Sequence, residues 1–191
     1  MLRSEHYSRT ASSTEPVTLT ETKTQLRIDH TDEDDDLTTK ITVARQECES
    51  KLGDVSLIDA VCVDYFDEFC DEMELHWQPV GSADVTSITY YDSTGTQQTL
   101  AATVYEVGQR HGVAYVRLKY DQSWPSYRGH EDDIAITYTA GYGTAGSDVP
   151  PAIRTWIMAR VGWLRGNRDG LEFPWNFDAL LGPHGRARAI G

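Results

Sequence analysis

The feature that most constrains the fold is a run of apolar residues at helical spacing in the first third of the chain. Intervals of four, three, four and four residues separate Leu37, Ile41, Ala44, Cys48 and Leu52, which places them on one face of an α-helix. Acidic residues precede the run and Gly53 follows it, as is typical of helix N- and C-termini. The pattern predicts a helix over 37–52 that buries one face.

Two further segments have helical patterns. The segment 19–28 offers Thr20 as an N-cap residue and Glu21 in the first turn, which predicts a short helix. A long final helix is expected to start at Pro150-Pro151, because proline is tolerated in a first turn. Its apolar face is formed by Ile153, Trp156, Ile157, Val161 and Leu164. This face must pack on the 37–52 helix or on a neighbouring subunit.

The middle of the chain has β-strand patterns. Residues 57–66 are expected to be extended, with 73–77 as a partner across the acidic turn 67–72. A hairpin is predicted between 85–92 and 97–100, and further strands at 104–107, 113–120 and 134–138. The predicted class is therefore α+β: a helical core of short helix, long acidic-start helix and C-terminal helix, with an inserted antiparallel β-sheet or small sandwich.

Five segments follow from these patterns. They are a flexible N-terminal arm (1–16), the first part of the helical core (17–56), a β-rich insertion (57–148), a C-terminal core helix (149–170) and a C-terminal tail (171–191). The tail is apolar, and either docks on a partner or folds back on the chain's own core. Neither a membrane-spanning apolar stretch nor a secretion signal is recognised, so the protein is expected in the cytoplasm where it is made.

Charge is unevenly distributed. Between Asp29 and Glu74 there are 16 acidic and 3 basic residues, which accounts for the whole net charge of −13. From Pro150 to Gly191, six arginines face three acidic residues. An acidic segment and a basic segment in one chain favour self-association, including head-to-tail contact between subunits, or docking on a charged partner. They argue against general affinity for nucleic acid.

No constellation of catalytic or metal-binding residues is found. Cys48, Cys62 and Cys70 match no zinc spacing and are expected to be reduced. The acidic run 32–36 lacks the glycine and glutamate of a calcium loop, and the glycine-rich segment 141–146 lacks the Lys-Ser or Lys-Thr of a phosphate loop. We therefore expect no enzyme activity, no metal and no cofactor, although paired carboxylates cannot be recognised from sequence because their separation is three-dimensional.

Several segments together resemble a known family. They are Leu26-Arg27-Ile28-Asp29-His30, the acidic-start helix with its Ala44-Arg45 step, residues 85–92, residues 136–143, Val149-Pro150-Pro151-Ala152-Ile153-Arg154 and residues 178–183. In this order, over about 17–188, the chain resembles the head-tail connector (portal adaptor) proteins of tailed bacteriophages, in the branch with a β-rich insertion.

The resemblance implies a structural protein of the virion neck, which assembles in the host cytoplasm. Such proteins form a ring of twelve subunits under the portal protein, extend the DNA channel and support the next connector or tail-completion protein. Genomic DNA would pass through without sequence-specific binding, and no membrane would be involved. The expected portal-binding residues are Trp175, Phe177, Leu180, Leu181, Arg186 and Arg188. Candidate acidic residues facing the channel, where they would repel phosphate, are Asp32, Glu33, Asp34, Asp35 and Asp36.

Two other functions stay open on sequence grounds. The β-rich insertion could present Trp124 and Tyr127 to a carbohydrate or host surface, since exposed aromatic rings stack on sugars. A hydrolase using scattered carboxylates is the third possibility, although no recognisable catalytic constellation supports it.

Overall fold

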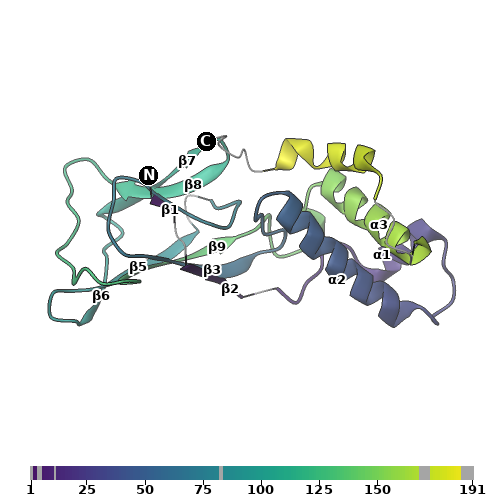
Figure 1. Ribbon diagram of the computed structural model, residues 1–191, viewed down its shortest axis with the longest axis horizontal. Helices are drawn as coiled ribbons and strands as arrows, with labels where there is room; N and C mark the ends of the chain where they lie inside the picture. The colour runs from purple at the N-terminus through teal and green to yellow at the C-terminus, as the bar shows by residue number, and fades with distance from the viewer. Residues whose placement is uncertain (1, 4–5, 11, 82–83, 168–172, 186–191) are drawn as a thin grey trace. The chain divides into compact units, whose positions relative to one another are not determined.

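The structure is a computed structural model that describes residues 2–3, 6–10, 12–81, 84–167 and 173–185. The chain divides into two compact units (Figure 1). We call residues 1–11 and 59–141 the β unit, and residues 12–58 and 142–191 the helical unit. Each unit has its own hydrophobic core.

The helical unit is built on three α-helices. They are α1 (Leu19–Leu26), α2 (Asp34–Lys51) and α3 (Pro151–Gly166). The apolar face predicted for α2 is buried, and it packs against the face of α3 that carries Ile153, Trp156, Ile157 and Val161. The core of this unit is thus closed within one chain, which settles the choice between packing on α2 and packing on a neighbour.

Local capping explains where two of these helices begin and end. The N-cap of α1 is Thr18 rather than the expected Thr20, because Thr18 and Glu21 form a capping box. Thr18 Oγ1 accepts from the Glu21 N–H at 3.1 Å, and the Glu21 carboxylate accepts from the Thr18 N–H at 2.9 Å. At the end of α2, Gly53 follows the C-cap with a φ of 85°, which confirms the predicted glycine stop.

Short 3₁₀ segments complete the helical unit. They are η1 (Gly146–Asp148) before α3, and η2 (Trp175–Leu180) and η3 (Gly182–His184) in the C-terminal tail. Leu181, between the last two, is buried in the helical core. The described part of the tail therefore folds back on its own chain.

The β unit contains two sheets around one core (Figure 1). The four-stranded sheet has the order β1 (Leu2–Arg3), β4 (Met73–Glu74), β8 (Val113–Leu118), β7 (Tyr105–Arg110). The five-stranded sheet has the order β2 (His6–Arg9), β3 (Ala60–Phe66), β9 (Ile134–Ala140), β5 (Val85–Tyr91), β6 (Gln97–Thr99). Buried and partly exposed residues alternate along β9, as expected for a strand with one face on the core.

Two expectations about strands need correction. Residues 73–77 do not pair with 57–66 across the acidic turn, because β4 lies in the other sheet and pairs with β8 and β1. Residues 6–9, inside the segment expected to be a flexible arm, form β2 and pair with β3 from His6↔Tyr65 to Arg9↔Cys62. Backbone pairing at a sheet edge holds this segment although none of its side chains is fully buried.

The α+β class is confirmed, and the insertion is antiparallel apart from the parallel pair β1–β4. The β unit takes up 59–141 of the predicted insertion 57–148, because Leu57, Ile58, Tyr142 and Val149 pack in the helical core. In the described part of the chain, no helix combines the length and apolar character needed to span a membrane.

Candidate interaction surfaces

The acidic run at the start of α2 is partly neutralised by cations of the same chain. The Glu33 carboxylate accepts two hydrogen bonds from Arg165 of α3, at 2.6 Å from Nε and 3.0 Å from Nη2. Asp34 pairs with Lys23 of α1 at 2.6 Å, and Asp36 pairs with Lys40 one turn along α2. Glu33 and Asp34 therefore join the start of α2 to α3 and α1, whereas Asp36 pairs within α2.

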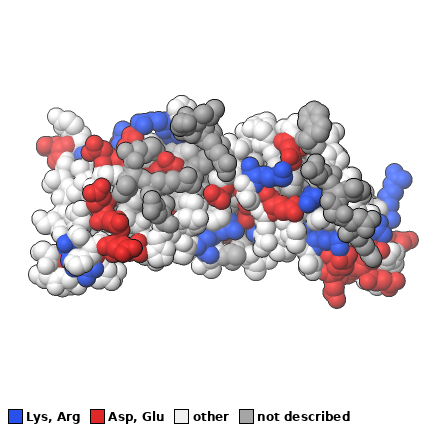
Figure 2. All heavy atoms as spheres, in the orientation of Figure 1, with Lys and Arg blue, Asp and Glu red and all other residues white. Residues whose placement is uncertain are grey.

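Asp32 and Asp35 belong to the same acidic run. Both side chains are exposed, and Figure 2 shows acidic side chains gathered at this N-terminal end of α2. Within the described ranges, no three His, Cys, Asp or Glu side chains are arranged to hold a metal ion. Of the five residues expected to face the channel, Asp32, Asp35 and Asp36 have exposed side chains, and Asp36 is paired with Lys40.

The arginines of α3 are also paired within the chain. Arg160 donates to Glu47 of α2 at 2.6 Å and 3.0 Å, and Arg154 pairs with Glu21 of α1 while donating to the Pro16 carbonyl at 3.0 Å. Arg154, Arg160 and Arg165 of α3 are therefore all paired with acidic residues of the same subunit. Contact between the acidic and basic segments is therefore intramolecular at these residues, whereas sequence suggested that it could join subunits.

The tail is anchored by one carboxylate and a set of aromatic rings. Asp178 accepts from the Trp156 indole N–H at 3.0 Å and from Lys51 Nζ at 2.8 Å. Burial acts against ionisation, but these two hydrogen bonds prevail and lower the pKa of Asp178 below its ordinary value. Phe173 packs edge-on against Trp156 and stacks on Phe177, with ring centroids at 5.5 Å and 5.2 Å.

The expected portal-binding residues fall into four groups. Leu181 is buried in the helical core, and Phe177 and Leu180 pack on the core while staying partly exposed. The backbone of Trp175 belongs to η2. Arg186 and Arg188 lie outside the described residues. The described part of this segment contributes Phe173, Asp178 and Leu181 to the core around Trp156, so we expect removal of 171–191 to disturb the helical unit.

The aromatic residues suggested for sugar binding are engaged with the β unit itself. Trp124 stacks on Phe69 with centroids 4.7 Å apart and donates its indole N–H to the Cys70 carbonyl at 3.2 Å. Tyr127 packs edge-on against the same phenyl ring, at 5.3 Å. Both rings are partly buried, so this arrangement supports packing rather than an open platform for a sugar.

Sequence reasoning missed the partners that hold these surfaces. Glu47, Lys23 and Asp178 carry no local signal, since their partners lie 113, 11 and 127 positions away in sequence. Phe173 was not recognised as a ring that packs on Trp156. Only the three-dimensional arrangement identifies them.

Part of the sequence matches a known protein family. The sequence model of the phage gp6-like head-tail connector proteins matches residues 16–78, which include all of α1, α2 and β3. This is a structural family, which confirms the expectation of a protein that is not an enzyme. No curated protein sequence matches the chain.

Three solved structures are similar over nearly the whole chain. A chain from the neck of an empty gene transfer agent particle, computed with C6 symmetry, has a TM-score of 0.79 at 17% identity and covers 97% of this chain and 98% of its own. A chain from the virion of the native particle has a TM-score of 0.77 at 18% identity, covering 97% of each. A chain from the native neck, computed with C12 symmetry, has a TM-score of 0.70 at 18% identity, covering 97% and 98%. Residues 16–78 thus match the phage gp6-like head-tail connector family, and nearly the whole chain shares the fold of these neck and virion proteins.

Proposed function

We propose that this protein is a structural component of the neck of a tailed phage or gene transfer agent particle, where it connects head and tail. The observation that carries the proposal is the family match over 16–78, combined with a fold shared over 97% of the chain with proteins of gene transfer agent particles. A closed core in each unit suits such a role, because the subunit can fold before it meets its partners.

In the assembled neck, we propose a closed ring of twelve copies under the portal protein. Support comes from the C6 and C12 symmetry of the necks that contain the similar chains. Identical subunits that contact each other head to tail close into a ring when the rotation between them is a whole fraction of a turn. The ring would support the next connector or tail-completion protein on its other face.

The C-terminal tail is the proposed portal contact. Asp178 and Leu181 tether it to the helical core, while Phe177 and Leu180 keep part of their apolar surface outward. A tail segment that is already tethered at these residues pays less conformational entropy when it binds a partner. In this proposal Trp175, Phe177, Leu180, Arg186 and Arg188 contact the portal, and Leu181 acts as the intramolecular anchor.

The acidic N-terminal end of α2 is the proposed lining of the DNA channel. Asp32 and Asp35 are exposed there, and their charge would repel the phosphate backbone and let the duplex slide. Genomic DNA is in this sense a transient partner that the ring does not bind specifically.

A truncation tests the portal contact. Removing 182–191 leaves Phe173, Asp178 and Leu181 in place, so the helical unit should keep its thermal stability. Binding to purified portal rings should fall by about tenfold or more, because the two terminal arginines and their ion pairs are lost. A matched variant, Arg117→Ala, removes a cation from the β unit and should bind normally. Undiminished portal binding by the truncated chain would refute the tail contact.

A further inference from the structure

The chain crosses between the two units three times, and polar contacts along α2 link the three segments of the helical unit next to these crossings. The helical unit begins at residue 12, is left at residue 58 and is re-entered at residue 142. We call residues 12–17, 55–58 and 142–149 the exit segments. All belong to the helical unit, and each has buried apolar residues in its core, among them Val17, Leu57 and Val149.

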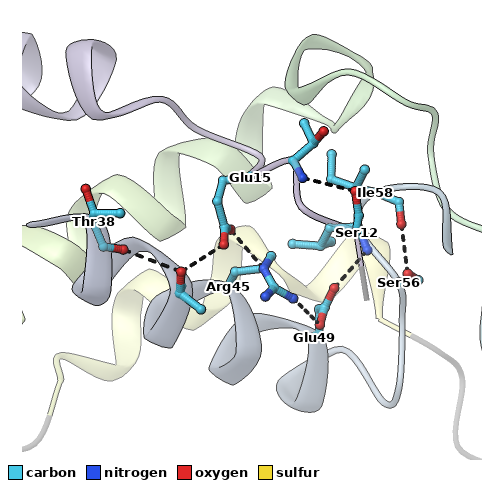
Figure 3. Close-up of polar contacts among 10 residues, drawn as sticks. Ser12, Glu15, Thr38, Arg45, Glu49, Ser56 and Ile58 are labelled. Atoms are coloured by element: carbon cyan, nitrogen blue, oxygen red, sulfur yellow. Dashed lines mark hydrogen bonds and ion pairs between the residues drawn. The ribbon is translucent and has the colours of Figure 1, made fainter. Parts of the chain in front are cut away.

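The first exit segment is held by Glu15. Its Oε2 accepts from Arg45 Nε at 2.8 Å, and its Oε1 accepts from the Thr42 hydroxyl at 2.9 Å. Figure 3 shows Glu15 and Arg45 pointing toward one another from the segment before α1 and from α2. The Pro16 carbonyl, next in sequence, accepts from Arg154 of α3. This exit segment is therefore tied by side chains to two helices.

The second and third exit segments are held through Glu49. Arg45 Nη1 donates to Glu49 Oε2 at 3.1 Å, and Glu49 Oε1 accepts from the Leu57 N–H at 3.2 Å (Figure 3). The Leu57 carbonyl in turn accepts from the Tyr142 N–H at 3.4 Å. The contacts thus run from Glu15 through Arg45, Glu49 and Leu57 to Tyr142, and reach all three exit segments.

Burial makes the loss of one partner more costly here than at an ordinary surface ion pair. The side chains of Arg45 and Glu49 are only 10% and 6% exposed. Apolar packing is non-directional and lets a segment slide, whereas hydrogen bonds to a fixed carboxylate set its register. Removing one member of such a pair also leaves the other charge buried without compensation.

We propose that Arg45 and Glu49 form a clasp that holds the three exit segments at set positions on α2. A force applied to the exit segments is then transmitted to the packed helices α2 and α3. The exit segments themselves stay attached to the helical core. Arg45 and Glu49 are positioning residues in this device, and the inference does not depend on the proposed place of the protein in a virion.

Hydrogen exchange of the full-length protein tests the clasp. In Glu49→Leu, the Leu57 amide loses its acceptor, so peptides covering 55–58 should exchange about tenfold faster or more, with a smaller rise over 12–17 and 142–149. Peptides in the middle of α3, around Ile157 and Val161, should change far less. The matched control is Glu47→Leu, two positions away on α2, which breaks the pair with Arg160 but should leave the exit segments protected.

A milder pair of variants covers the case in which Glu49→Leu does not fold. Glu49→Gln keeps an acceptor for the Leu57 amide but loses the charge that faces Arg45, so exit-segment exchange should rise by about threefold. Glu47→Gln should leave it unchanged. The clasp is refuted if Glu49→Gln exchanges at the exit segments as the unmodified protein does. It is equally refuted if exchange rises by the same factor in the middle of α3, since the pair would then act only on overall stability.

Discussion

Arg160 of α3 donates two hydrogen bonds, of 2.6 and 3.0 Å, to the carboxylate of Glu47 in α2. Its guanidinium carbon also lies 5.2 Å from the ring centroid of Phe173. One side chain therefore joins the two longest helices to the C-terminal tail. The acidic and basic segments of the sequence meet here inside a single subunit. Stability of the helical unit and attachment of the tail should consequently respond together to changes at this position.

Replacing Arg160 by alanine should lower the free energy of unfolding of the helical unit by about 1 to 2 kcal/mol. The estimate combines a charge-assisted pair, discounted because the Glu47 side chain is 36% exposed, with the contact to Phe173. Urea denaturation followed by helical circular dichroism measures it. Arg117→Ala, at an exposed pair with Glu106 in the β unit, should change the free energy of unfolding far less. Equal effects of the two variants would contradict this view of Arg160.

Gly108 of β7 lies opposite Tyr115 of β8, and a Cβ at this position would meet the tyrosine ring at 2.5 Å. Gly108→Ala should therefore destabilise the β unit by about 1 to 3 kcal/mol through overpacking. A double-mutant cycle with Tyr115→Ser checks the cause, since the alanine should cost little once the ring is absent. Additive losses in the cycle would show that the ring is not responsible.

Acidification should loosen the C-terminal tail. Because the pKa of Asp178 is lowered in the folded state, its ionised form stabilises the tail at pH values above the ordinary carboxyl pKa of about 3.9. That contribution is lost as the pH falls through the lower folded-state pKa. The NMR signal of the Trp156 indole N–H should thus be constant from pH 7 to 5 and shift only below about pH 4. In Asp178→Asn this shift at low pH should disappear. In the unmodified protein, a titration midpoint of the indole signal at or above the ordinary carboxyl pKa would contradict the assignment to Asp178.

Charge reversal tests the acidic end of α2. Asp32→Lys combined with Asp35→Lys should lower the urea midpoint only slightly, because both side chains are exposed and the main cost is a cation in the first turn of α2. Particles assembled with this variant should release DNA more slowly, by an amount that falls as salt is added. The matched control is Glu131→Lys, an exposed acidic residue of the β unit. Identical release by both variants would place this end of α2 away from the DNA.

Much of the fold follows from local periodicity. The spacing of apolar residues predicted α2 and α3 within a few positions, and the turn Ser93–Thr96 predicted the hairpin of β5 and β6. Strand partners were harder, because pairing is a long-range choice that no turn signal encodes. The two-residue strand β4 turns out to pair with β8, some 40 residues further on, instead of with the neighbouring β3.

The interaction surfaces were predictable only in part. An acidic run before a helix correctly indicated an exposed, charged end. It did not indicate which carboxylates are neutralised, since Glu33 finds its partner 132 residues away in Arg165. The apolar tail left two alternatives open, and the burial of Leu181 shows that its described part packs on its own core. A hydrophobic residue near a terminus carries no local mark that distinguishes an anchor from a docking group.

The most direct test of the central claim is cryo-electron microscopy of the vertex between head and tail in purified particles that carry this gene product, with its copy number measured by mass spectrometry. We expect a closed ring of this chain at the neck, at a copy number close to that of the portal, with the C-terminal tail on the portal side. Absence of the chain from mature particles, or its location away from the neck, would contradict it.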